Sequence, residues 1–146
     1  MSGVTESHNF VRANVSPPGS PALPPLVWSA EIAASAQAYA DACVFEHSKG
    51  KYGENLYAGT AVVTGASVVD AWASEVEDYA YENAKCATGK ACGHYTQVVW
   101  RDSQRVGCAV TTCTKNSPFG STNKGEWQNW VCQYDPPGNY VGEKPY

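Results

Sequence analysis

The chain has 146 residues, of which 43% are hydrophobic, and its formal net charge is -4 at pH 7. This length suits one domain, expected over residues 1–146, and the lysines and arginines are scattered singly, so nucleic acid is not an expected partner. No apolar run approaches the roughly 20 residues that cross a bilayer, and a transmembrane segment is therefore not expected.

The first third of the chain predicts two helices. Residues 5–15 suit a short helix that stops at the prolines beginning with Pro17, because proline cannot continue helical hydrogen bonding. Ser29 is a good N-cap for a second helix, expected to run through an alanine-rich body to about Phe45. The inner face of this helix carries small alanines and Cys43, which suits close packing against a sheet and a disulfide that reaches into it.

The middle of the chain predicts a short strand and a third helix. Residues 53–57 suit an edge strand or an irregular segment, and residues 65–79 suit the helix. The apolar arc of this helix is defined by Val68, Trp72 and Tyr79. Glu75 falls inside that arc, whereas the solvated acids lie on the opposite side. A carboxylate placed there needs a partner when it is buried.

The last third indicates β structure. A short helical or irregular segment at residues 93–100 precedes a strand at residues 106–113, in which side chains alternate between two faces. A second strand is expected at residues 126–134, after a long hairpin connection at residues 115–125. The tail from Pro136 is expected to be extended. Helices before and around a cross-linked sheet predict an α+β fold.

The cysteines favour disulfides in an oxidising compartment over a structural zinc site, because no Cys-x-x-Cys pair occurs. They are Cys43, Cys86, Cys92, Cys108, Cys113 and Cys132. Cys86 and Cys92 flank a tight turn and can close a small loop. In a strand, Cys108 and Cys113 would lie about 16 Å apart and face opposite ways, so they cannot bond each other.

Two motifs, Gly93-His94-Tyr95-Thr96-Gln97-Val98-Val99-Trp100 and the stretch from Trp130 to Tyr140, resemble the two signatures of the CAP superfamily. This superfamily comprises cysteine-rich secretory proteins, antigen 5 and pathogenesis-related class 1 proteins, and the six cysteines resemble its pathogenesis-related branch. The resemblance implies a three-layer α-β-α sandwich. It also implies that Cys43 bonds Cys113 and that Cys108 bonds Cys132.

The resemblance places two histidines and two acids around one cleft: His47, Glu54, Glu75 and His94. Neutral imidazole and carboxylate both suit zinc, so this tetrad could hold a divalent metal, although none is expected to be required. A rival interpretation is a metal-dependent hydrolase. Ser48 is a conceivable nucleophile but is better explained as a turn or capping hydroxyl. A further alternative is that His–Glu hydrogen bonds are structural and hold no ligand.

Tyr79, Tyr81 and Cys86 lie where sterol-binding relatives carry a loop with three spaced aromatics. Cys86 stands where that pattern has its third aromatic, so weak sterol binding or none is expected. Ordinary aromatic packing, or a fatty acid lying between helices, are the alternatives. The preferred interpretation is a secreted, extracellular monomer, with its signal peptide absent from this chain, that binds sterol or fatty acid in defence or in a host-microbe contest.

The segment from Pro136 to Tyr146 resembles a peptide that is released from plant relatives. Release would require cleavage between Asp135 and Pro136, in an extended stretch that proline and glycine make accessible. The chain would then be the precursor of a signalling peptide. The alternative is that the tail packs across the sandwich.

Overall fold

The computed structural model describes residues 1, 3–120 and 125–146. Part of the connection expected at residues 115–125 therefore lies outside the described residues. The helices are α1 Val4–Ala13, α2 Ala30–Ala40, α3 Gly65–Ala73 and α4 Gly93–Val98, with 3-10 turns η1 Ser74–Asp78 and η2 Tyr81–Asn83. The strands are β1 Val27–Trp28, β2 Gly53–Gly59, β3 Tyr79–Ala80, β4 Lys85–Cys86, β5 Arg105–Cys113 and β6 Trp127–Asp135.

The main sheet has the strand order β1-β5-β6-β2. β5 and β6 form its antiparallel centre, with Cys108 opposite Cys132. β2 pairs with β6 on one side and is an edge strand, as expected, while the short β1 runs parallel to β5 at the other edge. A second small sheet is the β3–β4 hairpin.

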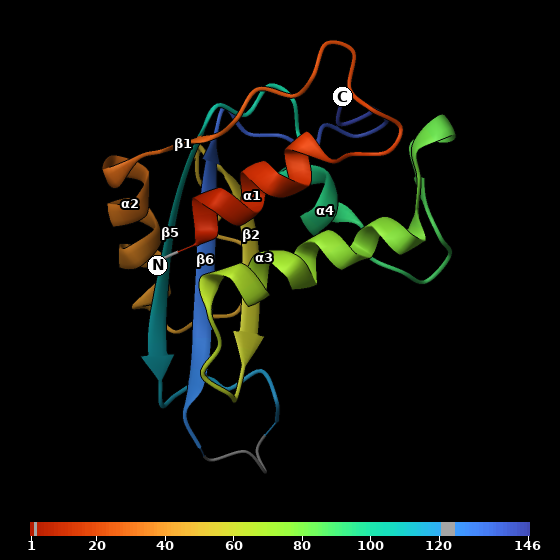
Figure 1. The fold of residues 1–146 in the computed structure, drawn as a ribbon. Helices are drawn as coiled ribbons and strands as arrows, with labels where there is room; N and C mark the ends of the chain where they lie inside the picture. The colour runs from red at the N-terminus through yellow and green to blue at the C-terminus, as the bar shows by residue number, and fades with distance from the viewer. Residues whose placement is uncertain (2, 121–124) are drawn as a thin grey trace.

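Helices cover both faces of the main sheet, which confirms the three-layer α-β-α arrangement (Figure 1). On one face, residues of α1, α3 and α4 pack on alternate residues of the central strands, among them Val106, Cys108, Trp130 and Tyr134. On the other face, Ala36 and Ala40 of α2 pack on Ala109 and Val131. The alternation expected in β5 is therefore confirmed.

α2 approaches the sheet very closely at Gly107. A Cβ atom on Gly107 would lie 2.1 Å from the main-chain nitrogen of Ala33 and 2.6 Å from the carbonyl carbon of Ile32. The small alanines of α2 and the absence of a side chain at Gly107 make this contact possible.

α2 ends at Ala40, earlier than the expected end near Phe45, and the placement of Cys43 on a helical face is wrong. Asn129 of β6 donates its side-chain N–H to the carbonyl of Ala40, and the Cys43 N–H also bonds this carbonyl. Cys43 then adopts a left-handed conformation with φ 53°. A partner from the sheet thus satisfies the last helical carbonyl and ends the helix.

The third helix also ends earlier than residues 65–79 suggested. The α-helical part stops at Ala73, η1 continues the turn to Asp78, and Tyr79 begins β3. Val68 and Trp72 are buried, as the apolar arc predicted. The start of the predicted helix was therefore correct and its end was wrong, because the segment after Ala73 is a tighter 3-10 turn that carries Glu75 and Tyr79 belongs to a strand.

Arg12 and Asn9 fix α1 to the core through hydrogen bonds to main-chain groups. Asn9 exchanges two hydrogen bonds with the main chain of Leu26, at 3.0 and 2.7 Å. Arg12 is buried, and its guanidinium donates to the carbonyls of Pro24, Val98, Trp100, Arg101 and Ser103. Burial lowers the pKa of Arg12 to about 10. Main-chain carbonyl oxygens accept its hydrogen bonds and so compensate for the burial of this cation.

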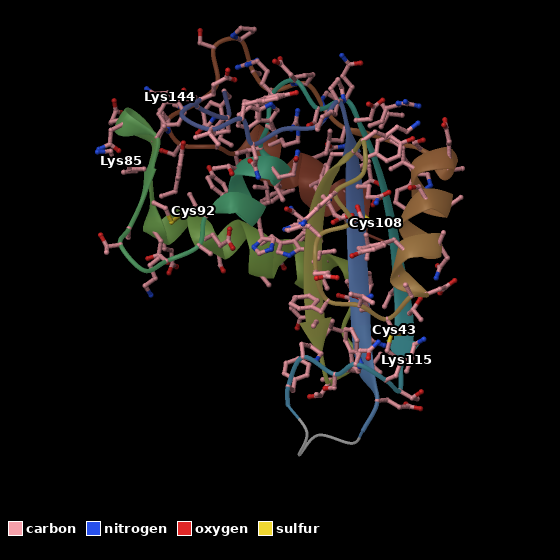
Figure 2. The ribbon with its side chains drawn as sticks, turned by 180° about the vertical axis from the view of Figure 1, so that it is seen from behind. Cys43, Lys85, Cys92, Cys108, Lys115 and Lys144 are labelled. Atoms are coloured by element: carbon pink, nitrogen blue, oxygen red, sulfur yellow. A yellow bond between two sulfur atoms is a disulfide. The ribbon has the colours of Figure 1, made fainter. Side chains whose placement is uncertain are left out.

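All six cysteines form the expected disulfides, Cys43–Cys113, Cys86–Cys92 and Cys108–Cys132. Figure 2 labels Cys43, Cys92 and Cys108 at separate places on the molecule. Within the part of the chain that the structure describes, no helix is long and apolar enough to span a membrane.

Candidate functional site

Within the expected tetrad, His47 and Glu54 form one hydrogen-bonded pair. His47 lies in the loop after α2, and its Nδ1 is 3.1 Å from Oε1 of Glu54 in β2. Ser48 donates its main-chain N–H to the same oxygen and its hydroxyl to Oε2, and the Gln133 side chain also donates to Oε2. The Glu54 side chain is 5% exposed, whereas that of His47 is 60% exposed. The carboxylate is thus saturated by donors.

His94 and Glu75 form the second pair. His94 is in the first turn of α4, and its Nδ1 lies 2.6 Å from Oε1 of Glu75 in η1. The other oxygen of Glu75 accepts the main-chain N–H of Tyr95 at 2.9 Å. The His94 ring stacks on Trp72, with centroids 6.2 Å apart and planes within 11°. The partner that Glu75 needed is therefore His94 together with the α4 backbone.

A small pocket of about 200 Å³ brings His47, Glu54 and His94 together, and Glu75 is not among its lining residues. Among the residues that the structure describes, neither histidine Nε2 has a hydrogen bond. No group of three or more His, Cys, Asp or Glu side chains in this described part is arranged to hold a metal ion. The four residues thus divide into two imidazoles with available Nε2 atoms and two carboxylates that orient them.

Ser48 is engaged with a carboxylate rather than with an imidazole. Its hydroxyl donates to Glu54 Oε2 at 2.7 Å, and hydrogen bonds with His47, the Ser48 N–H and Gln133 already occupy that carboxylate, so it is poorly placed to take up the serine proton as a nucleophile requires. The geometry therefore favours the interpretation of Ser48 as a turn and capping hydroxyl.

A buried hydrogen-bond chain behind the pocket was not predicted. The Asn55 side chain donates to the carbonyl of His94 at 3.0 Å and to the Tyr134 hydroxyl at 3.2 Å. The Tyr134 hydroxyl lies 2.7 Å from Nε2 of His8, whose Nδ1 is 2.8 Å from the carbonyl of Val4. Since a carbonyl only accepts, Nδ1 of His8 donates and Nε2 accepts. In the sequence, the signal for this hydrogen-bond chain was Asn55, which directly follows the candidate site residue Glu54.

The aromatic loop is the β3–β4 hairpin, in which Tyr79 pairs with Cys86. Tyr81 lies at its tip, and its ring is covered by the chain's own tail. Tyr146 stacks on Tyr81 with centroids 4.6 Å apart, and Lys144 Nζ lies 4.6 Å from the Tyr81 centroid. The expected loop residues are therefore brought together, but Tyr81 already has an aromatic partner.

An apolar groove lies between α1 and the α3–η1 segment, with a volume of about 320 Å³. It is lined by Phe10, Val11, Asn14, Val15, Ser16, Ala73, Val76 and Tyr95. Phe10 is 70% exposed and Val76 is 42% exposed. Large apolar side chains that share one exposed hollow are typical of a site for an apolar ligand.

The bond between Asp135 and Pro136 lies where β6 ends. The Asp135 carbonyl accepts the Gln104 N–H at 2.9 Å, and its side chain lies 2.5 Å from Arg105 Nη2. The Pro136 carbonyl accepts the Ser103 hydroxyl at 2.8 Å. The tail beyond packs on the body of the protein, with a turn at residues 141–142. Cleavage of this bond stays a prediction.

Comparison with known proteins places these features in a family. A sequence model of the cysteine-rich secretory protein family (CAP) matches residues 5–134. Pathogenesis-related protein 1A of Nicotiana tabacum is 43% identical over 146 residues, which cover 97% of this chain and 77% of that protein. Pathogenesis-related protein PR-1 of Medicago truncatula is 45% identical over 143 residues, covering 94% and 74%. The crystal structure of NaASP2 with Zn2+ has a TM-score of 0.74 at 25% identity, covering 99% of this chain and 83% of that one.

Proposed function

The chain belongs to the cysteine-rich secretory protein (CAP) family, and on that premise we propose that it is a secreted, monomeric lipid-binding protein of the pathogenesis-related class. Its pathogenesis-related relatives support the class. Its three disulfides suit an oxidising, extracellular compartment. Binding without catalysis agrees with a Ser48 hydroxyl that donates to a carboxylate. The biological setting we propose is defence or a host-microbe contest.

The observation that carries this proposal is the groove between α1 and the α3–η1 segment. Its lining is dominated by aliphatic and aromatic side chains, with Asn14 and Ser16 as its polar members. An acyl chain needs such a lining along its length and only a few polar contacts at its headgroup. The ligand that fits best is therefore a fatty acid or another lipid with a single extended chain.

The aromatic hairpin suits a sterol less well. Cys86 is held in a disulfide with Cys92, and Tyr81 is stacked against Tyr146. A sterol at Tyr79 and Tyr81 would have to displace Tyr146 and would lack the third ring. We therefore expect sterol binding to be weaker than fatty-acid binding.

Titration with palmitate and, separately, with cholesterol tests the lipid proposal. Phe10→Ser and Val76→Ser each remove exposed apolar surface from the groove, and each is expected to lower palmitate affinity by about 1 to 2 kcal/mol, or about 5- to 30-fold. Val62→Ser is the matched control, because Val62 is 87% exposed and lies outside the groove. Equal palmitate affinity in the wild type and all three variants would show that the groove is not the lipid-binding site.

A second candidate function is zinc binding, favoured by the two histidine–carboxylate hydrogen bonds. A ligating imidazole commonly bonds a carboxylate through its other nitrogen, which fixes its tautomer and orientation. Nε2 of His47 and Nε2 of His94 would hold the ion, while Glu54 and Glu75 keep the rings in place. Zinc bound there would supply a Lewis acid in the pocket. The crystal structure of NaASP2 with Zn2+, 25% identical to this chain, supports the choice of zinc as the metal by similarity.

Calorimetric titration with zinc checks the site. His94→Ala is expected to lower zinc affinity more than about 10-fold, and Glu75→Gln about 10-fold or more through loss of orientation. Affinity is expected to fall on acidification, since imidazole binds metal in its neutral form. Glu46→Gln changes an exposed acid one residue before His47 and serves as the control. If the double variant His47→Ala, His94→Ala binds zinc as the wild type does, the tetrad is structural.

A further inference from the structure

The body of the protein carries buried polar side chains whose hydrogen bonds are completed by the tail, residues 136–146. Gln97 is 1% exposed and Ser103 is 0% exposed. Gln97 donates to the Ser103 hydroxyl at 3.1 Å, which in turn donates to the carbonyl of Pro136 at 2.8 Å. The Gln97 oxygen accepts the N–H of Gly138 at 3.1 Å. Loss of the tail would leave these buried groups without those partners, which is costly.

The N-terminal end of the tail also complements α4, through hydrogen bonds and through close packing. The Asn139 side chain donates to the carbonyl of Gly93 and accepts the hydroxyl of Thr96, both at 2.7 Å. Gly138 lies against the Trp100 ring so closely that a Cβ there would be 2.5 Å from Cγ of the indole. The surface formed by α4 and Trp100 therefore favours a glycine followed by an asparagine, as in Gly138-Asn139.

The far end of the tail is held separately. Pro145 is buried, and its carbonyl accepts the Arg101 N–H at 2.8 Å. The Tyr81 hydroxyl donates to the main-chain oxygen of Tyr146, and the two rings are stacked. Lys144 adds a cation–π contact with Tyr81. Between the two ends the tail is exposed, and Val141 is 102% exposed.

Because specific contacts hold both ends of the tail, we propose that the body of the protein is a peptide-binding site whose ligand is a segment with the sequence of its own tail, bent by the turn at residues 141–142. The tail fills this site in cis. A tail that is severed at Asp135–Pro136 therefore stays bound, and its liberation requires dissociation as well as cleavage. The proposal does not rest on lipid or zinc binding, because the tail is held by contacts outside the groove between α1 and the α3–η1 segment and without the two histidine side chains. Asn139 of the tail does line the histidine pocket.

The test uses the full chain with a recognition sequence for a site-specific protease inserted between Asp135 and Pro136, cut after folding and oxidation. The severed peptide is expected to remain with the body through gel filtration and in native mass spectrometry. A fluorescent synthetic peptide of residues 136–146 is expected to exchange into the cut protein and bind saturably. It is expected not to bind the uncut chain, whose own tail occupies the seat.

Variant peptides identify which contacts hold the tail. Peptides with Asn139→Ala or Tyr146→Ala are each expected to bind about 5- to 30-fold more weakly, since each loses hydrogen bonds or a ring stack. A Val141→Ala peptide is expected to bind within about twofold of the parent, as its side chain is fully exposed. Immediate loss of the severed peptide, or equal binding of all four peptides, would overturn the proposal. So would loss of the near-ultraviolet circular dichroism of the body on cutting.

A second measurement does not depend on the insertion. In the unaltered chain, hydrogen exchange at the Gly138 and Arg101 amides, which join tail and body, is expected to be at least about 100-fold slower than at the Val141 amide. Tyr146→Ala is expected to speed exchange at Arg101 while leaving the Ser29 amide, bonded to Val106 in the sheet, unchanged. Exchange at Gly138 as fast as at Val141 would contradict a tightly seated tail.

Discussion

At the scale of single residues, His8 is the buried base that links α1 to the candidate site. It is 0% exposed, and burial, the main cause, lowers its pKa from 6.5 to about 4. Both of its ring nitrogens are hydrogen-bonded: Nδ1 donates to the carbonyl of Val4, and Nε2 accepts from the Tyr134 hydroxyl. A proton added at Nε2 would oppose the Tyr134 hydroxyl, so the fold needs His8 neutral.

His8 should make the protein lose stability in mild acid. The folded pKa of about 4 lies below the unfolded value of 6.5, so the unfolded chain binds more protons between these values. The stabilisation is complete above pH 6.5 and falls by about 3 kcal/mol as pH drops to 4. Urea unfolding at pH 7, 5.5 and 4 should show this loss in wild type and in the exposed control His47→Gln, but a much smaller one in His8→Gln. Parallel pH profiles for all three would exclude His8 as the cause.

At the scale of elements, the close contact between α2 and β5 depends on Gly107. Gly107→Ala would place a methyl group within 2.1 Å of the α2 backbone. Because a backbone cannot move aside as a flexible side chain can, we expect a loss of about 2 to 3 kcal/mol in the free energy of unfolding. Gly50→Ala is the control, since its Cβ would meet only Ser48 Oγ at 3.5 Å. Equal midpoints of urea unfolding for both variants would mean that α2 shifts without cost.

The ends of helices and strands were predicted where hydrophobic periodicity or a capping residue determines them. They were not predicted where a contact with a residue far away in the chain determines them. Ser29 accepts the Ile32 N–H and begins α2, as its position suggested. The end of α2 depends on Asn129, which is 89 residues away in the chain, and local sequence contains no sign of it. The need of Glu75 for a partner followed from the helix face, and its place in one cleft with His94 followed from the family resemblance, whereas the direct bond between them is a finding of the structure. The division into orienting carboxylates and free Nε2 atoms depends on ring orientation, which only the folded structure fixes.

At the scale of the whole molecule, the tail (residues 136–146) lines two pockets. Asn139 lines both the histidine pocket and a cavity of about 240 Å³ beside the β3–β4 hairpin. The three disulfides differ in what they connect, and Cys108–Cys132 joins two paired strands of the sheet. Cys43–Cys113 joins the segment that follows α2 to the end of β5 across 70 residues, whereas Cys86–Cys92 spans 6 residues within one loop.

Loss of the long link should therefore cost more than loss of the short one. On the chain-entropy model, removing Cys43–Cys113 costs about 4 kcal/mol and removing Cys86–Cys92 about 2 kcal/mol. Cys43 and Cys113 are also buried against Trp127, so replacing both with Ala adds the cost of a small cavity. Urea unfolding of the two double-Ala variants, with the other disulfides confirmed by mass spectrometry, measures the difference. Equal losses of stability would show that the link between α2 and β5 is not what constrains the unfolded chain, and that packing of alanines on the sheet holds α2 by itself.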